Sequence, residues 1–510
     1  MKFNLKKYRI GLLALIVIAS ATGCKKYLDE DSRSNFTQEN YFTTENQARI
    51  FVNGIYGGNI NSINYGLYFF QNGDAYGEAP FITLELFAGH TTTLGQSTNN
   101  KKVINQNTDP TNPGFETVWK SCYTAIEECN IALARIPAIS MPDATKNAML
   151  GEVYFLRAFY YYHLVRLYGD VPLLTTPVDI KSPLLYPERT PKEQVYDQVV
   201  NDLLAAEKSG MPNVDQTGKV SLGAVHTLLS SVYLTMAGYP LQKTENYAKA
   251  AAEAQQVLPL YTLFDDYAFL HDNPHKNLGE LIFQSQYLVG VATNAITQLT
   301  VPFNLQVGAY GDHLGAMIPT DDFFKSYEAG DKRTEEKQFY FSKYPSSDNP
   351  ADTINFGEHC LYKYFQVESS VSGTANSGKC DENWTLLRLP EAMLIYAEAT
   401  NEVSGPTPEA YTQINKIRAR ANLQPLSGLS KDQFREAIWK ERYHELAYEN
   451  KAYFDIQRTH QVYDVKNNKF GPATSTPNEQ GVTMKEQYYL WPVPQRERNT
   501  NTKLTQNTGW

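Results

Sequence analysis

"NAMLGEVYFLRAFYYYHLVRLYGDVP", residues 147 to 172, is the stretch that decides the fold. It is apolar on nearly every face, which is typical of a helix surrounded by other helices in a protein interior. Gly169 can end the helix, and Pro172 cannot continue it. Arg157 and Arg166 argue against a membrane span, because charged side chains are costly in lipid. The stretch therefore predicts a central buried helix.

Helical patterns continue on both sides of this stretch. Residues 221–258 are predicted to form two helices joined by a loop, a pairing that resembles a tetratricopeptide unit, and residues 386–423 form a similar pair. A short strand is expected at 280–287, where apolar residues alternate. The pattern predicts a mainly α fold, a tetratricopeptide-like scaffold of helix pairs with little β. Further helices are predicted at 44–57, 115–136, 192–210 and 431–450.

Two long inserts interrupt the helices, at 58–114 and at about 260–385. Both contain glycine-rich stretches dotted with aromatic residues, and we expect them to be largely irregular. Long irregular inserts in a compact protein are usually functional or disordered, and the aromatic content argues against disorder. We expect the region 44–258, with the first insert, and the region 259–510, with the second, to form one compact unit.

The overall charge excludes some ligand classes. The chain has 510 residues, with 46 basic and 55 acidic residues and a net charge of −9. An acidic surface repels phosphates, so nucleic acid and anionic lipid are not expected partners. The 35 tyrosines suit surfaces that both stack and hydrogen-bond, although most of them are expected to line helix contacts.

The first residues are typical of an export signal. Basic residues precede "IGLLALIVIA" (10–19), an apolar run that is too short to span a bilayer, since a span needs about 20 residues. Small residues then lead to Cys24, a pattern that resembles the lipobox of bacterial lipoproteins, with Ala21 where leucine is usual. We expect residues 1–23 to be a lipoprotein signal peptide, Cys24 to be acylated and 24–43 to be a tether. The alternative is an ordinary secreted protein cut near Ala21.

The other four cysteines are not expected to form a zinc site, because no CxxC occurs. Cys122 and Cys129 lie seven residues apart on a predicted helix, about 10 Å along its axis and too far for a disulfide. We expect both to be buried as small apolar residues. Cys360 and Cys380 can pair across a loop or stay free, and the sequence leaves both possibilities open.

An incomplete zinc motif lies near the end of the chain. His444 and Glu445 begin HExxH, but residue 448 is Tyr, so a zinc site is rejected.

The same helix carries an acidic stripe of Glu441, Glu445 and Glu449. We expect these carboxylates to pair with nearby arginines, namely Arg435 and Arg442.

No catalytic constellation emerges from the sequence. It lacks the nucleophile elbow G-x-S-x-G and the nucleotide-binding glycine motifs, and no histidines pair at metal spacing. We therefore expect no catalysis, no cofactor and no metal. A glycoside hydrolase remains an alternative, because it needs only two carboxylates about 5 to 10 Å apart, for example Asp74 with Glu78.

Several of these stretches resemble the SusD/RagB family of outer-membrane nutrient-binding lipoproteins. The resemblance covers nearly the whole chain, with the motifs in the family's order. It rests on "CKKYLDE" (24–30), "FLRAFYYYHLVRLYGDVPLL" (155–174), "YTLFDDYAFL" (261–270), "GELIFQSQY" (279–287), "LLRLPEAMLIYAEATNE" (386–402), "INKIRARANL" (414–423), "IWKERYHELAYENKAYFDIQRT" (438–459) and "YLWPVPQRERNTNTKLTQNTGW" (489–510).

The resemblance implies about four tetratricopeptide-like helix pairs and a lipid anchor on the outer membrane, facing the cell exterior. It implies a non-catalytic protein that binds glycans or oligosaccharides and delivers them to a SusC-like TonB-dependent transporter. Capture of peptides is the alternative within the family, and a helical-repeat adaptor for protein partners is a third hypothesis. The inserts would hold the ligand, and by region and residue type we select Asp74, Tyr76, Tyr287, Phe303, Tyr310 and His313.

Overall fold

The computed structural model describes residues 42–57, 79–302, 314–365 and 380–510, apart from residues 96, 180, 289, 290, 295, 347, 348, 350 and 479. This part of the chain contains 15 α-helices, while its eight strands are short and pair only two by two. The prediction of a mainly α fold with little β is therefore confirmed.

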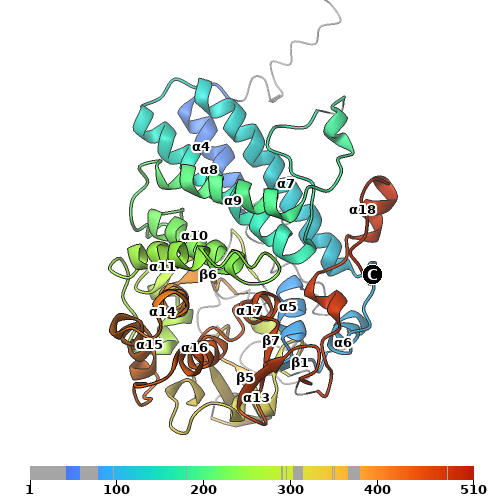
Figure 1. The fold of residues 1–510 in the computed structure, drawn as a ribbon. Helices are drawn as coiled ribbons and strands as arrows, with labels where there is room; N and C mark the ends of the chain where they lie inside the picture. The colour runs from blue at the N-terminus through green and yellow to red at the C-terminus, as the bar shows by residue number, and fades with distance from the viewer. Residues whose placement is uncertain are drawn as a thin grey trace, which may run out of the picture.

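The helices form stacked layers (Figure 1). In this view α4, α7, α8 and α9 lie in the upper half, α10 and α11 cross the middle, and the lower half holds α14–α17 and most strands, together with α5 and α6. Consecutive helices pack against one another, and α11 packs against α14, which joins the two halves in a tetratricopeptide-like arrangement. The main helices are α4 (Glu45–Gly57), α7 (Pro113–Arg135), α8 (Asp143–Tyr168), α9 (Lys192–Glu207), α10 (Leu222–Ala237), α11 (Asn246–Val257), α14 (Leu389–Ser404), α15 (Pro408–Arg420) and α16 (Lys431–Glu445).

We call residues 45–258 the first half of the molecule and residues 259–510 the second half, and α8 is the central helix of the first half. Of its 26 residues, 17 are buried, and it packs against both α7 and α9. The helix ends at Gly169, whose φ of 72° favours glycine, and a Cβ there would lie 2.9 Å from Cδ1 of Leu490. Inside the protein, Arg157 pairs with Asp202 of α9 at 2.7 Å. The prediction of a central buried helix that stops at Gly169 is confirmed.

Buried tyrosines on α8 hold neighbouring segments by their hydroxyl groups. Tyr160 donates to the carbonyl of Ile55 on α4 at 3.0 Å. Tyr168 donates to the carbonyl of Phe115 on α7 at 2.6 Å. A buried phenol needs such a partner, since an unpaired polar group in the interior is costly. The tyrosine-rich stretch therefore supplies both apolar packing and specific links to α4 and α7.

One part of the first insert is more regular than expected. Residues Pro80–Ala88 form α5, and every one of them is buried. The prediction of an irregular segment over 58–114 is wrong here, because a helix that is apolar on all faces shows no helical period in its sequence. A second short helix, α6 (Thr98–Ile104), follows within the same insert and is capped by the Ser97 side chain.

The last long helix is shorter than predicted. α16 ends at Glu445, not at residue 450. Tyr448 and Asn450 both take positive φ, at 63° and 58°, which a helix cannot accommodate. The turn is stabilised by Asn450, whose side-chain amide donates to the carbonyl of Phe81 and whose backbone N–H donates to Glu85. Contacts with α5 thus decide where the helix stops.

A buried ionic cluster fills the interior of the second half. It has five bases and five acids, and none of their side chains is more than 7% exposed. Arg388 lies at its centre and binds Glu445 at 2.6 Å and Glu449 at 2.8 Å. The cluster consists of Arg333, Lys363, Arg388, Arg418, Arg420, Glu280, Asp331, Glu441, Glu445 and Glu449.

The acidic stripe is therefore paired with arginines, but not with the predicted ones. Arg435 binds Glu402 at 2.5 Å, and Arg442 binds Asp455 at 3.1 Å. The stripe faces inward, toward bases that arrive from distant segments, whereas the predicted partners were chosen for being near in sequence. Burial alone would raise the pKa of Glu445, but Arg420, Arg388 and Arg333 outweigh it and lower that pKa to about 2.

The strands form four antiparallel pairs. β2 and β6 make the pair that matters most for the interior, because Leu281 lies opposite Arg388 and so brings Glu280 beside the ionic cluster. A strand at 280–287 was predicted and is confirmed as β2. The pairs are β1 (Thr91–Thr92) with β3 (Ile318–Pro319), β2 (Leu281–Ser285) with β6 (Trp384–Arg388), β4 (Tyr340–Pro345) with β5 (Thr353–Leu361), and β7 (Gln461–Asp464) with β8 (Lys469–Pro472).

The four cysteines among the described residues are free and buried. Cys122 and Cys129 pack in the core as predicted. The open question about Cys360 and Cys380 is answered, since they form no disulfide. Burial raises the pKa of the Cys380 thiol to about 11, so it stays protonated at neutral pH.

The final segment returns to the first half and closes its interior. We call residues 487–510, which include α18 (Gln495–Thr500), the C-terminal clasp. The backbone N–H of Trp491 donates to the carbonyl of Leu167 on α8 at 2.6 Å. The Asn507 side chain donates to the carbonyl of Tyr168 at 3.0 Å. The rings of Trp491 and Phe115 lie 4.9 Å apart, so the clasp is part of the core around α8.

Candidate ligand-binding site

The predicted ligand residues fall mostly outside the described part of the chain. Asp74, Tyr76, Phe303, Tyr310 and His313 lie there, as does the predicted lipidation site Cys24.

Tyr287 is the one selected residue that the structure describes. It is only 7% exposed and belongs to the hydrophobic core. Its backbone N–H donates to the side chain of Asn383 at 2.8 Å, and Lys276 donates to its carbonyl at 3.2 Å. A ring so deeply buried offers little face to a ligand, so Tyr287 packs in the hydrophobic core, and its role as a ligand contact stays a prediction.

A polar floor supports the ends of the second insert. We use this name for residues 271–276, 292–294 and 380–383. Asn294 and Cys380 exchange backbone hydrogen bonds of 2.9 Å, and the Asn294 side chain donates to the carbonyl of Glu382 at 2.6 Å. Lys276 lies 3.7 Å from the Asp381 carboxylate. These contacts join the segment around Asn294 to the segment that begins at Cys380.

The polar floor contains one buried pair, His271 and Glu382, in which burial disfavours the charged form of both groups. His271 Nδ1 lies 3.4 Å from Oε1 of Glu382, and both side chains are almost fully buried. Burial lowers the pKa of His271 well below its usual value, and Lys363 lowers it further. Burial also raises the pKa of Glu382 well above its usual value. Both side chains are enclosed by protein.

An open cavity of about 320 Å³ lies between α8, the turn after α10, α17 (Ala452–Thr459) and the end of the chain. Three rings in its lining form a stack, which we call the ring stack. Tyr239 and His460 lie 3.8 Å apart between centroids, and His460 and Tyr489 lie 4.0 Å apart, with interplanar angles of 8° and 9°. Tyr239 is 39% exposed, so the stack has an accessible ring at one end.

Backbone geometry positions each ring. α10 ends before Gly238, where a Cβ would lie 2.4 Å from the carbonyl of Arg458, so only glycine allows this approach. Tyr239 then donates its backbone N–H to the same carbonyl at 2.8 Å. His460 ends α17 with a φ of 56°, which turns the chain and points the ring at its two neighbours. Tyr489 is held in the C-terminal clasp.

Polar groups surround the ring stack. Gln457 donates to the carbonyls of Arg166 and Tyr489 at 3.0 and 2.6 Å. Burial lowers the pKa of His460, so its ring is neutral near pH 7. Burial and Glu486 raise the pKa of Tyr489 to about 12, so its hydroxyl stays protonated. Neutral ring faces with hydrogen-bonding groups beside them suit the C–H faces and hydroxyls of a sugar.

Sequence reasoning missed the ring stack. Its three residues are spread over 250 positions, and each lies in an ordinary turn or helix end. The only local signal was an aromatic residue beside Gly238, which is too common to select.

The residues of the incomplete zinc motif make contacts within the protein interior. His444 is buried, and its Nε2 lies 2.8 Å from the hydroxyl of Ser326. Glu445 belongs to the ionic cluster, and Tyr448 lies in the turn after α16. The rejection of a zinc site at these positions is consistent with this arrangement. One other group of metal-ligating side chains occurs among the described residues, on α9, α10 and α11.

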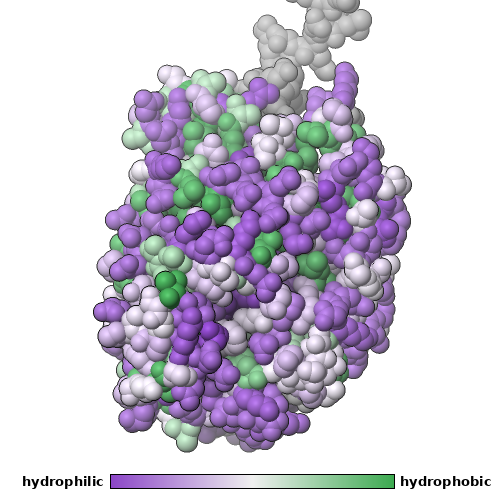
Figure 2. Space-filling view, in the orientation of Figure 1, coloured by the Kyte–Doolittle hydropathy of each residue, from purple (hydrophilic) through white to green (hydrophobic). Residues whose placement is uncertain are grey.

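The surface shown in Figure 2 is mostly hydrophilic, with hydrophobic residues scattered in small patches. No helix in the described ranges combines the length and the apolar character needed to cross a membrane.

Comparison with known proteins gives matches along the chain. The profile of the SusD family matches residues 317–510, and a SusD-like profile described as "Starch-binding associating with outer membrane" matches residues 27–234. A SusD superfamily protein from Parabacteroides distasonis has a solved structure that is 33% identical, with a TM-score of 0.85, covering 93% of this chain and 100% of that one. SusD-like protein P2 of Formosa agariphila is 28% identical over 99% of both chains.

More distant solved structures share the fold. A laminarin-binding SusD-like protein and surface glycan-binding protein A from Bacteroides thetaiotaomicron are each 20% identical, with TM-scores of 0.73. Each comparison covers 92% of this chain and 100% of the other protein. The likeness thus extends over nearly the full length of every chain compared.

Proposed function

This chain belongs to the SusD/RagB family, and from that premise we propose that it captures a glycan or oligosaccharide at the cell surface and delivers it to a SusC-like TonB-dependent transporter. The observation that carries the proposal is the full-length likeness to a SusD superfamily structure at a TM-score of 0.85. The names of two further structural neighbours, a laminarin-binding SusD-like protein and a surface glycan-binding protein, support carbohydrate as the ligand class.

The chemistry of the chain supports a binding protein. The cavity beside the ring stack is at the lower end of the size range of small-molecule sites, and it combines aromatic faces with amide and hydroxyl groups. The inserts add the predicted contacts from Asp74, Tyr76, Phe303, Tyr310 and His313. The net charge of −9 suits a neutral ligand better than a polyanion.

The start of the sequence supports a cell-surface location. The basic residues, the apolar run and Cys24 match a lipoprotein signal, so we propose a lipid anchor on the outer membrane. One acyl chain binds a membrane only marginally, whereas several bind it firmly, so the anchor would carry more than one chain. Replacing Cys24 by Ala should abolish incorporation of a labelled fatty acid and release the protein from the membrane fraction. Retention of label in that variant would contradict the proposed anchor.

Binding to a panel of glycans by calorimetry or affinity gels tests the ligand class. We expect at least one oligosaccharide to bind, without new reducing ends after long incubation. Binding of peptides without detectable binding of any glycan would support the alternative of peptide capture. Release of reducing ends that Asp74→Asn abolishes would select the glycoside hydrolase instead.

Two sets of variants locate the glycan once it is found. Tyr76→Ala tests the first insert, and Tyr489→Ala tests the ring stack. Loss of one stacking ring should weaken binding by about tenfold. Tyr186→Ala is the matched control, because Tyr186 is 47% exposed and lies away from both positions in the sequence. If neither variant differs from the control, both assignments of the site fail, although the ligand class still stands.

Pull-down from solubilised membranes tests the partner. We expect a large β-barrel protein to be recovered with the anchored chain. Recovery of soluble proteins alone would support the adaptor hypothesis.

A further inference from the structure

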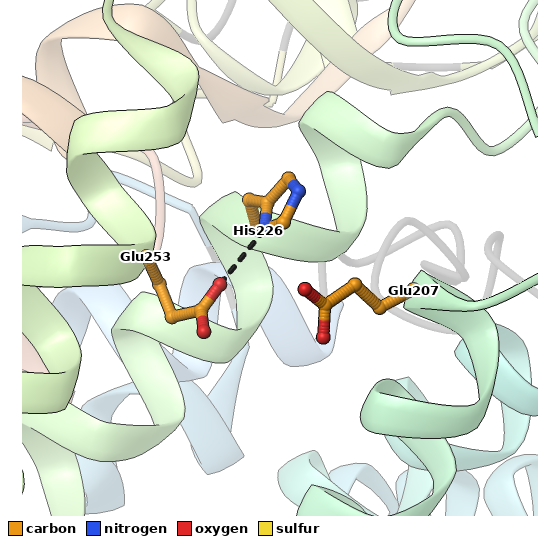
Figure 3. Close-up of side chains that lie close together, drawn as sticks. All are labelled: Glu207, His226 and Glu253. Atoms are coloured by element: carbon orange, nitrogen blue, oxygen red, sulfur yellow. Dashed lines mark hydrogen bonds and ion pairs between the residues drawn. The ribbon is translucent and has the colours of Figure 1, made fainter.

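Three metal-ligating side chains converge where consecutive helix pairs meet. Glu207 is the last residue of α9, His226 lies on α10 and Glu253 lies on α11. One ligand atom from each lies within 4.8 Å of the others. Figure 3 shows the His226 ring between the two carboxylates, with Glu253 on one side and Glu207 on the other. Three side chains that span 46 positions of the sequence thus point toward one small volume.

The packing of the helices produces this convergence. α10 and α11 pack closely along Ala250 and Ala254, which are fully buried. His226 and Glu253 lie at the rim of that contact, where their side chains are 14% and 18% exposed, and His226 Nδ1 lies 2.7 Å from Oε2 of Glu253. α9 packs against α10 and ends with its final residue at the same place. The buried faces of α9, α10 and α11 therefore fix the positions of the three side chains, which lie at the rim of these faces.

The charges in this group are not balanced. His226 can neutralise one carboxylate at most, and only when it is protonated. Within the described part of the chain, no hydrogen bond or ion pair engages the Glu207 carboxylate. Glu207 also ends its helix, where the helix dipole is negative and disfavours an acidic residue. A cation at this point would offset the excess negative charge.

We propose that Glu207, His226 and Glu253 bind a divalent transition-metal ion, with Zn²⁺ as the best fit. An imidazole nitrogen with two carboxylate oxygens is a donor set that Zn²⁺ accepts, with water in the fourth position. Mg²⁺ and Ca²⁺ prefer oxygen ligands alone, so the histidine argues against both. The ion would link α9 to the α10–α11 pair and so fasten one helix pair to the next.

The required adjustment is small. Zinc–ligand distances near 2.0 Å place tetrahedral ligands about 3.3 Å apart, compared with the present spread of up to 4.8 Å. Glu207 can close this difference by rotating its side chain, because the movement breaks no hydrogen bond among the described residues. Nδ1 of His226, whose N–H now donates to Glu253, would release that proton and bind the metal in place of this contact. This site is independent of the proposed glycan function.

Calorimetric titration of the untagged full chain with Zn²⁺, after treatment with a chelator, tests the proposal. We expect one ion to bind, and at a hundredfold excess over Kd the Tm should rise by about 3 °C. Glu207→Gln should weaken binding by at least about tenfold while leaving the metal-free Tm unchanged, because the Glu207 carboxylate has no partner to lose. Glu245→Gln is the matched control, since Glu245 is exposed on the turn before α11.

His226→Gln gives a second, independent readout. Co²⁺ bound to wild type should show the visible absorption of a tetrahedral site with a nitrogen ligand, and the variant should lose it. Equal Zn²⁺ affinity in wild type and both variants would overturn the proposal. Binding of Ca²⁺ that His226→Gln leaves intact would overturn the histidine's role.

Discussion

The interiors of the two halves are built from different materials. Around α8, buried rings and aliphatic groups fill most of the space, tyrosine hydroxyls donate to backbone carbonyls, and the Arg157–Asp202 ion pair is buried among them. Around α16, ten charged side chains fill it and pair with one another. The two halves nevertheless have the same kind of scaffold, since both consist of packed helix pairs.

The difference shows that similar arrangements of packed helices can be stabilised by interactions that respond differently to substitution. Apolar packing loses free energy in proportion to the atoms removed, and its neighbours can relax. Removing the partner of a buried charge greatly lowers the free energy of unfolding, because the remaining charge is left in the interior with neither a partner nor water. We therefore expect substitutions in the interior of the first half to cause graded losses of stability. Substitutions of charged residues in the interior of the second half should each cause a large loss.

The largest effect should come from Arg388→Met. This change leaves Glu280, Glu445 and Glu449 without their shared partner, and removing one member of a buried pair alone costs about 3 to 5 kcal/mol. We expect the free energy of unfolding to fall by at least about 5 kcal/mol, measured by urea denaturation and circular dichroism. Arg435→Met is the matched control and should cost about 1 kcal/mol or less, because that side chain is 25% exposed. A stable Arg388→Met protein would remove the contrast between the halves.

A smaller loss is expected in the apolar interior. Leu156 on α8 is fully buried, and Leu156→Ala should lower the free energy of unfolding by about 3 kcal/mol. Ile50→Ala on α4 is the control and should change it by less than about 0.5 kcal/mol, since Ile50 is 53% exposed. We expect the protein to stay folded and the loss to be the same at pH 7 and pH 5. A strong pH dependence would show that the apolar interior also relies on charge.

Lowering the pH should destabilise the second half before it destabilises the first half. The pKa of Glu445 is about 2 in the folded protein and about 4.5 in the unfolded chain, so its stabilising contribution is full above pH 4.5 and is lost as the pH falls toward 2. The contribution is on the order of 3 kcal/mol. Peptide-resolved hydrogen exchange, corrected for intrinsic rates, should show α16 losing protection at a higher pH than α8. Parallel loss in both helices would mean that the halves unfold as one unit.

The smallest effect tests the tyrosine links. Tyr168→Phe removes the hydroxyl that donates to Phe115 and should cost about 1 kcal/mol. Tyr186→Phe, at an exposed position, should leave the Tm unchanged. If the two variants behave alike in a thermal scan, the hydroxyl groups around α8 add nothing beyond ring packing.

The sequence predicts the elements whose signal is local. The apolar stretch around Tyr160 and the break at Gly169 are visible in a few neighbouring residues, and both are confirmed. α5 was missed because Phe81 and its neighbours are buried on all sides, which removes the period that reveals a helix. α16 was predicted too long because its end depends on contacts with α5.

Long-range pairing could not be predicted in the same way. The stripe of Glu441, Glu445 and Glu449 was recognised, but its partners come from segments up to 112 residues away. The ring stack has the same difficulty, since Tyr239 and Tyr489 meet only after the chain has folded. Composition therefore revealed which residue types were abundant, and only the fold revealed which of them meet.

The C-terminal clasp sets a lower limit on when the first half can be completed. Trp491 caps the contacts of Leu167 and Phe115, yet it follows α8 by more than 300 residues. At ribosomal rates of about 5 to 20 residues per second, this wait is roughly 15 to 65 s. During that interval the aromatic face around Phe115 lacks its contact with Trp491, so we expect a nascent chain of this protein to bind chaperones.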